Sequence, residues 1–139
     1  MSFKFPYQYG YVDNRKIPYP IVTVVLNTIR GKRSFFFIMD TGADTLTLPK
    51  HMISLLGINK NSLTQSLSQG IGKKLVKTWE GKILIEFCER NFPVRCSFTD
   101  NNKTPFLLGK EDVFDKFNVI FNNEEQLTIF KEIMQTTSK

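Results

Sequence analysis

The stretch FFFIMDTGADTLTLP, residues 35–49, carries the strongest signal for the fold of this chain. Its apolar first part is typical of a buried strand, and Asp40 follows directly. Burial disfavours the charged form of a carboxyl group, so an aspartate at this point is a candidate acid or base. Gly42 permits a tight turn, and Thr41 offers a hydroxyl to neighbouring backbone groups. The tripeptide is also compatible with an ordinary turn at the end of a strand.

Short apolar runs separated by turn residues continue this pattern along the chain. The β-branched run 21–25 favours a strand, and Arg30-Gly31-Lys32 provides a reversal after it. In a second hairpin we expect the turn near Arg90–Asn91. Many short strands with little helix predict an all-β barrel or sandwich. The other expected elements are hairpins over 66–81, 82–100 and 118–133, a short strand over 104–109, and short helices over 48–57 and 110–117.

Composition and charge exclude several classes of protein. The net charge is +6, but the positive residues are scattered, and only Lys73, Lys74 and Lys77 form a dense cluster. No nucleic-acid motif accompanies them, so we expect solvated surface charge; a nucleic-acid partner stays an alternative that salt-dependent binding would support. No stretch approaches the roughly 20 apolar residues that span a bilayer. With no secretory signal at the N-terminus, we expect a cytoplasmic protein without a membrane partner.

The cysteines and the histidine do not form a metal-binding pattern. Cys88 and Cys96 are not in a CxxC pair, and His51 is remote from both in the sequence. Structural zinc needs about four ligands at closer spacing, so we expect neither a metal nor another cofactor. Two reduced thiols in or near the core are the simplest interpretation, and a disulfide across a hairpin stays open.

Two further segments follow Asp40 in an order that is informative. We expect Gly70-Ile71-Gly72 to be the tip of a glycine-rich hairpin, and Leu107-Leu108-Gly109 to be an apolar strand that ends in glycine. With these pieces in this order, the chain resembles the retropepsin-like aspartic proteases, the single-domain class that includes the retroviral proteases. The resemblance covers roughly residues 20–130. Within it, the segment LLGKEDVFDKFNVIF looks especially like cellular, non-viral members of the family. The matching segments are MDTGADTLTLP, SQGIGKK and FLLGKEDVFDKFNVIF.

The resemblance implies a fold and an assembly. The chain would be one retropepsin-like acid-protease barrel over residues 1–139, with one or two short helices and an N-terminal arm over residues 1–18. It would be active as a two-fold dimer whose terminal strands interleave into a shared sheet. Only one Asp-[Ser/Thr]-Gly is present in the chain, so the second catalytic carboxylate would come from a second copy.

The resemblance also assigns roles to individual residues. Asp40 would be the catalytic carboxylate, and Thr41 would hydrogen-bond across to its twin in the second chain. Lys110 stands where many relatives carry arginine, so its brace to Asp44 would be weak or absent. The catalytic residues would be Asp40, Thr41 and Gly42, and the substrate-binding residues Ala43, Asp44, Gly70, Ile71, Gly72, Leu107 and Leu108.

These roles imply a homodimeric aspartic endopeptidase that hydrolyses peptide bonds with a water activated by paired Asp40 carboxylates. Such an enzyme needs no metal and forms no covalent intermediate. The alternative is a weakly active or inactive module of the same fold that binds peptides, because fold does not determine function.

Overall fold

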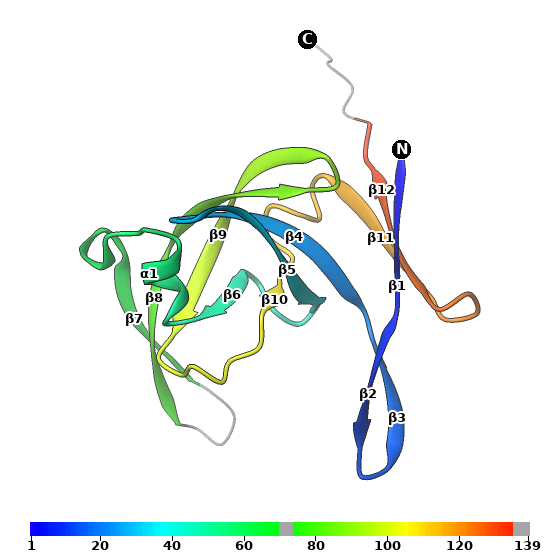
Figure 1. Cartoon of the computed structure of the whole chain (residues 1–139), viewed down its shortest axis with the longest axis horizontal. Helices are drawn as coiled ribbons and strands as arrows, with labels where there is room; N and C mark the ends of the chain where they lie inside the picture. Colours follow the sequence, from blue (N-terminus) through cyan, green and yellow to red (C-terminus); the bar gives the residue numbers. More distant parts are fainter. Residues whose placement is uncertain (70–73, 135–139) are drawn as a thin grey trace.

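The computed structural model describes residues 1–69 and 74–134, and most of their regular structure is strand (Figure 1). The strands form a seven-stranded sheet, a three-stranded sheet and a separate two-stranded hairpin. The helical elements of the described residues are the α-helix α1 (Met52–Leu55) and the 3₁₀ helix η1 (Lys60–Ser62). The predicted all-β architecture with short helices is therefore confirmed. Within the described ranges no helix is long and apolar enough to cross a membrane.

The seven-stranded sheet closes into a barrel. Its first strand pairs with the second and also with the sixth, at Val25 opposite Glu86 and Leu26 opposite Ile85. This pairing closes the first six strands into a ring, and the seventh strand pairs with the sixth outside it. In pairing order the strands are β4 (Ile21–Thr28), β5 (Gly31–Met39), β10 (Leu107–Leu108), β6 (Leu46–Pro49), β9 (Arg90–Thr99), β8 (Leu75–Phe87) and β7 (Thr64–Gln69).

Alternating burial along the strands builds the core. On β4, Val22, Val24 and Leu26 are buried, and the residues between them are half-buried on the other face. This period of two is the pattern of a strand with one face toward the core. On β9 the buried side chains are those of Phe92, Val94, Cys96 and Phe98.

The two ends of the chain form the three-stranded sheet. Strand β1 (Ser2–Pro6) is antiparallel to β12 (Leu127–Glu132), which is antiparallel to β11 (Phe117–Asn122). After β1 the chain forms the two-stranded hairpin of β2 (Gln8–Val12) and β3 (Arg15–Tyr19). Aromatic residues alternate through this region, at Phe3, Phe5, Tyr7, Tyr9 and Tyr11, so a strand period is present in the sequence although only an arm was predicted there.

Aromatic rings join the terminal sheet to the barrel. The ring centroid of Phe87, on β8, lies 4.9 Å from that of Phe130 and 5.7 Å from that of Phe117. Phe5 of β1 stacks on Phe87 at 5.8 Å and also contacts Phe130 edge to face at 5.8 Å. Edge-to-face and stacked pairs of this kind add to the stabilisation from apolar burial. The two sheets therefore share one core.

Two local predictions were wrong. Residues 110–117 form successive turns and no helix, because Asp112 has a φ of 67°, which interrupts a right-handed helix. The β8–β9 hairpin turns at Cys88–Glu89, with φ of 51° and 62°, and not at Arg90–Asn91. Two consecutive left-handed residues are typical of the tight turns that match the twist of a hairpin.

Candidate active site

The backbone around Asp40 is held from both sides. The Met39 amide donates a hydrogen bond to the Pro20 carbonyl at 2.9 Å, and the Asp40 amide donates to the Leu108 carbonyl at 3.0 Å. These bonds continue the pairing of β5 with β4 on one side and with parallel β10 on the other. Asp40 therefore leaves the barrel at a well-defined point.

The Asp40 carboxylate is oriented by its own loop. The Gly42 amide donates to Asp40 Oδ1 at 2.9 Å, and the Ala43 amide donates to the Asp40 carbonyl at 3.2 Å. A Cβ atom on Gly42 would lie 3.2 Å from the same carboxylate oxygen. Asp40 is half-buried, whereas Thr41 and Gly42 are exposed in the single chain. The loop thus presents an oriented carboxylate at its outer side.

The segment after β10 crosses close to the loop. The Lys110 amide donates to the Ala43 carbonyl at 3.0 Å, and the Glu111 amide donates to the Asp44 carbonyl at 2.8 Å. A Cβ atom on Gly109 would lie only 2.5 Å from the Thr45 carbonyl oxygen. Real Cβ atoms do not approach a backbone so closely, so only glycine fits at this crossing.

An ion pair lies beside this crossing. Lys110 Nζ is 3.4 Å from Asp44 Oδ1, and the Asp44 side chain is 76% exposed. The brace that the sequence predicted to be weak or absent is therefore present as a single exposed contact. Exposed ion pairs of this kind contribute little to stability, because water and salt screen them. The backbone bonds from Lys110 and Glu111 hold the loop more firmly than this side chain does.

The other predicted residues lie at different depths. Ala43 and Leu107 are half-buried, close to the loop. Leu108 is fully buried in the core and supports Asp40 through its carbonyl. Gly70, Ile71 and Gly72, the predicted flap tip, lie outside the described residues. Strands β7 and β8 pair up to Gln69 opposite Leu75 on either side of that segment.

The two cysteines are free and buried, as the simpler interpretation of the sequence held. Burial raises the pKa of both thiols to about 12, so they are protonated near neutral pH. A protonated thiol is a poor nucleophile and a poor metal ligand. Within residues 1–69 and 74–134 no group of three His, Cys, Asp or Glu side chains could hold a metal ion.

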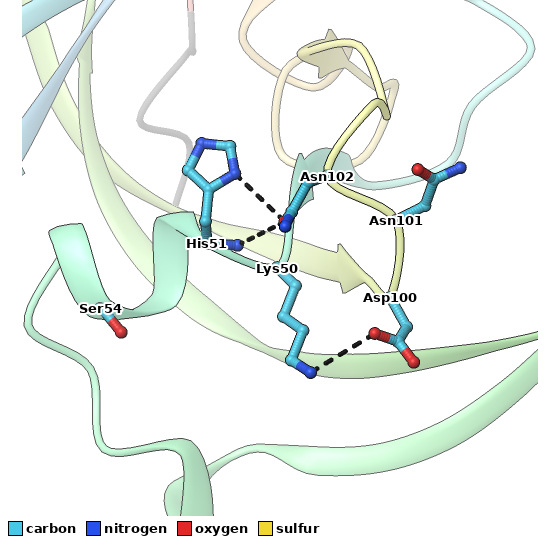
Figure 2. Close-up of a pocket in the computed structure, with 6 residues that line it drawn as sticks. All are labelled: Lys50, His51, Ser54, Asp100, Asn101 and Asn102. Carbon is cyan, nitrogen blue, oxygen red and sulfur yellow. Dashed lines mark hydrogen bonds and ion pairs between the residues drawn. The ribbon is translucent and has the colours of Figure 1, made fainter.

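A polar pocket of about 300 Å³ contains the histidine but not Asp40 (Figure 2). His51 Nδ1 lies 3.3 Å from Asn102 Oδ1, and Lys50 Nζ pairs with Asp100 Oδ1 at 3.4 Å. Figure 2 shows Ser54 pointing away from His51, whereas Asp100 faces Lys50. A serine hydrolase needs a serine that contacts a histidine, and a carboxylate that orients the histidine; these residues are not arranged in that way.

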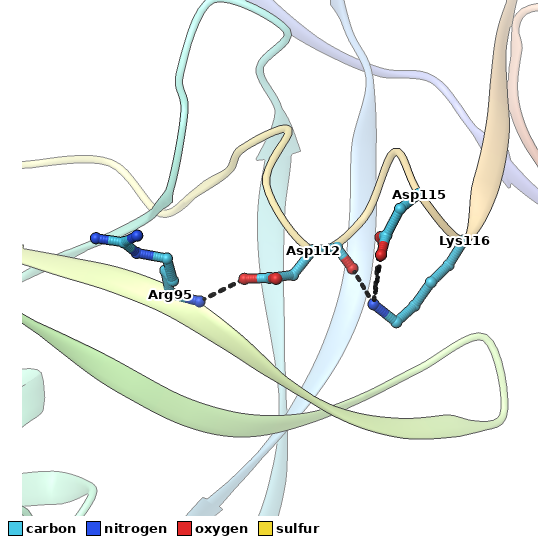
Figure 3. A network of polar contacts seen from close by, with 4 residues as sticks. All are labelled: Arg95, Asp112, Asp115 and Lys116. Atoms are coloured by element: carbon cyan, nitrogen blue, oxygen red, sulfur yellow. Dashed lines mark hydrogen bonds and ion pairs between the residues drawn. The ribbon is translucent and has the colours of Figure 1, made fainter.

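Other acidic residues serve the local structure (Figure 3). Asp112 Oδ2 accepts a hydrogen bond from the Arg95 amide at 2.8 Å, and Lys116 Nζ donates to the Asp112 carbonyl at 2.9 Å. Lys116 also contacts Asp115 Oδ1 at 3.2 Å. This network ties the segment after Gly109 to β9. Its partners on β9 and in the turn are distant in the sequence, so no local pattern predicts this network.

Comparison with known proteins identifies the fold. No family model matches the chain, and no curated protein matches it. Among solved structures, the chain is similar to a retropepsin-like aspartic protease from Rickettsia conorii, with a TM-score of 0.67 and 14% sequence identity. The match covers 93% of this chain and 98% of that one. The chain therefore has the retropepsin-like aspartic-protease fold, with the oriented carboxylate of Asp40 at the end of one of its barrel strands.

Proposed function

We propose that this protein is a homodimeric aspartic endopeptidase with Asp40 as its catalytic carboxylate. The observation that carries the proposal is the geometry of Asp40. Its carboxylate is held at 2.9 Å by the Gly42 amide, at a strand end that Leu108 supports from within the core. The retropepsin-like fold of the chain provides independent support.

The reaction requires two carboxylates. One, ionised, removes a proton from water as the water oxygen attacks the peptide carbonyl carbon. The other, protonated, donates its proton to the carbonyl oxygen as negative charge develops there. Two carboxylates a few ångströms apart do not ionise together easily, so they share one proton and titrate as a pair. Collapse of the tetrahedral intermediate then breaks the C–N bond, with a proton delivered to the leaving amine.

A second copy of the chain supplies the partner carboxylate in this proposal. A two-fold axis beside the loop brings Asp40 opposite the partner's Asp40. Thr41 and Gly42 are exposed in the single chain, so both are accessible to a partner. Thr41 would hydrogen-bond to the facing loop. The pair of loops would bury the half-exposed Asp40 carboxylate next to its twin and a water.

The peptide lies in this proposal against Ala43, Asp44 and Leu107, with Leu108 beneath and residues 70–72 closing from the other side as a flap. The exposed carboxylate of Asp44 and the nearby backbone can bond an extended peptide. The apolar side chains near the loop favour apolar residues next to the cleaved bond.

A module that binds peptides without cleaving them is the second candidate. The single Lys110–Asp44 contact at 3.4 Å favours it, since a weak brace leaves the loop less rigid than a two-pronged arginine would. Such a module would bind a peptide at acidic pH and release it intact.

Cleavage of an unfolded protein substrate between about pH 4 and pH 7 tests the proposal. The wild-type chain should cleave, and pepstatin should inhibit it. Asp40→Asn should lower kcat by about 10³-fold or more, because both carboxylates of the dimer become amides, which act neither as base toward water nor as acid toward the carbonyl oxygen. Asp115→Asn is the matched control, since the polar partner of Asp115 among the described residues is Lys116, and the substitution should leave the rate unchanged. Full activity in a folded Asp40→Asn protein would overturn the assignment.

A further inference from the structure

The β2–β3 hairpin projects past the catalytic end of the barrel. Ile21 lies opposite Ile38, and the Met39 amide bonds to the Pro20 carbonyl, so β4 and β5 end side by side at Asp40. Strand β3 precedes Pro20 directly and runs beyond that end. Its 5 residues span roughly 16 Å at the usual rise of a strand. Figure 1 shows the hairpin standing clear of the barrel, on the same side as the β7–β8 hairpin.

The base of the hairpin is anchored to the terminal sheet. The Tyr7 hydroxyl donates to Asn123 Oδ1 at 2.7 Å, and the Tyr7 amide donates to the Gln126 carbonyl at 2.9 Å. The Tyr9 hydroxyl bonds to the Gln126 side chain. Asp13 and Asn14 form a tight turn at the tip, with φ of 51° and 63°. The hairpin therefore has a defined direction relative to the barrel.

The outer part of the hairpin has no partner within the described residues. Strands β2 and β3 pair only with each other there. Tyr11 is 74% exposed and Val12 is 43% exposed. A two-stranded hairpin alone in water is marginally stable, and exposed aromatic side chains are enriched in protein interfaces. Both features indicate that another surface covers this part of the hairpin.

We propose that the hairpin, residues 8–19, is a clasp that packs on a second copy of this chain beside the catalytic loop. The inference rests on the proposed function, which puts Asp40 next to a two-fold axis. Since Pro20 is hydrogen-bonded to Met39, the residue before Asp40, the base of the hairpin lies next to the same axis. A hairpin that projects from that point faces the partner subunit, and Tyr11 is its anchor. Tyr9 is less available, because Lys16 Nζ covers its ring at 4.3 Å.

The test measures the dimer dissociation constant of the full chain by sedimentation equilibrium. Tyr11→Ser should raise this constant by about tenfold or more, as loss of an aromatic anchor does in other interfaces. Tyr11→Phe keeps the ring and should stay close to wild type. Ile29→Ser is the matched control, because Ile29 is 67% exposed but lies at the opposite end of β4.

A second variant shortens the hairpin. Gln8 and Tyr19 face each other at the base of the hairpin, so residues 9–18 can be replaced by Asn-Gly, which closes a two-residue turn. Circular dichroism and thermal unfolding would establish that the barrel is intact. This variant should weaken the dimer at least as much as Tyr11→Ser.

The outcomes separate the clasp from the protease. If neither variant changes the dimer dissociation constant, the clasp is overturned. This holds also if the variants raise the KM for cleavage, because the hairpin would then contact the peptide and not the partner subunit. A wild-type chain that stays monomeric at every concentration overturns it too. A dimer that these variants weaken, but that never cleaves, supports the clasp and counts against the protease. If the chain cleaves the substrate and these variants do not weaken its dimer, the result supports the protease and overturns the clasp.

Discussion

Two regions that meet at the end of β5 are held in different ways. The Asp40 loop, residues 40–45, is bound by backbone groups of Leu108, Lys110 and Glu111, which are distant in the sequence. The hairpin, residues 8–19, is held by its own strand pairing and by two tyrosine hydroxyls at its base. The loop therefore has little room for change, whereas the hairpin can adjust. Substitutions in the two regions should differ accordingly.

The largest difference is expected between two glycines. In Gly109→Ala the new Cβ would lie 2.5 Å from the Thr45 carbonyl and 2.7 Å from the Asp44 carbonyl, both of them backbone atoms. The loop and the crossing segment must separate, so we expect the free energy of unfolding to fall by about 3 kcal/mol or more. Urea denaturation followed by circular dichroism measures it.

Gly10→Ala in the hairpin is the matched substitution. There the Cβ would meet a ring carbon of Tyr19 at 3.0 Å, and a side chain can move by the few tenths of an ångström required. We expect a loss of about 1 kcal/mol or less, because alanine is also the better residue in a strand interior. Equal losses at the two positions would contradict the distinction between a rigid loop and an adjustable hairpin.

A smaller effect is expected from the anchor of the hairpin. Tyr7→Phe removes the hydroxyl that donates to Asn123 Oδ1 at 2.7 Å in a largely buried place. Loss of one such bond should lower the free energy of unfolding by about 1 kcal/mol. Tyr11→Phe is the control, since its hydroxyl belongs to a side chain that is 74% exposed, and the monomer should be unaffected. Equal thermal unfolding of both variants would show that Tyr7 does not anchor the hairpin.

The smallest effect concerns the thiols. Cys96 lies opposite Leu46 on β6, next to the Asp40 loop, and is 1% exposed. Burial raises its pKa to about 12, so iodoacetamide at about pH 8 should modify it very slowly in the folded protein. Gly109→Ala should speed the reaction by opening the loop. Rapid modification of the wild-type protein would contradict the tight packing behind this loop.

The same pKa values predict how the free energy of unfolding changes with pH. Each thiol has an ordinary pKa of 9.0 and a folded pKa of about 12, so the unfolded chain loses the proton first. The unfolding free energy should therefore fall as the pH rises from 9.0 towards 12, with the thiol contribution complete below 9.0. Replacing Cys88 and Cys96 with alanine should flatten this decline, which urea denaturation at several pH values would measure.

Local chemistry explains which elements the sequence could predict. The strands of the barrel were predicted because one buried face imposes alternation, as on β4. Strands β1 and β2 were not predicted, although aromatic residues alternate along them from Phe3 to Tyr11, whereas the hairpin of the terminal strands β11 and β12 was predicted. The helix predicted over residues 110–117 failed because Asp112 bonds to the Arg95 amide and takes a left-handed backbone. That contact spans two distant segments and leaves no mark in a short window of sequence.

The sequence by itself determined the all-β class, the position of Asp40 at a strand end, and the glycine that follows Leu108. Each depends on a residue type that a few neighbours require: alternating apolar side chains, a carboxylate after an apolar run, and a glycine at a close approach. Only the tertiary structure decided the single Lys110–Asp44 contact, the bonds from Leu108 and Pro20 on either side of the Asp40 loop, and the projecting hairpin. These depend on segments up to about a hundred residues apart, whose meeting is a property of the closed barrel and its shared core.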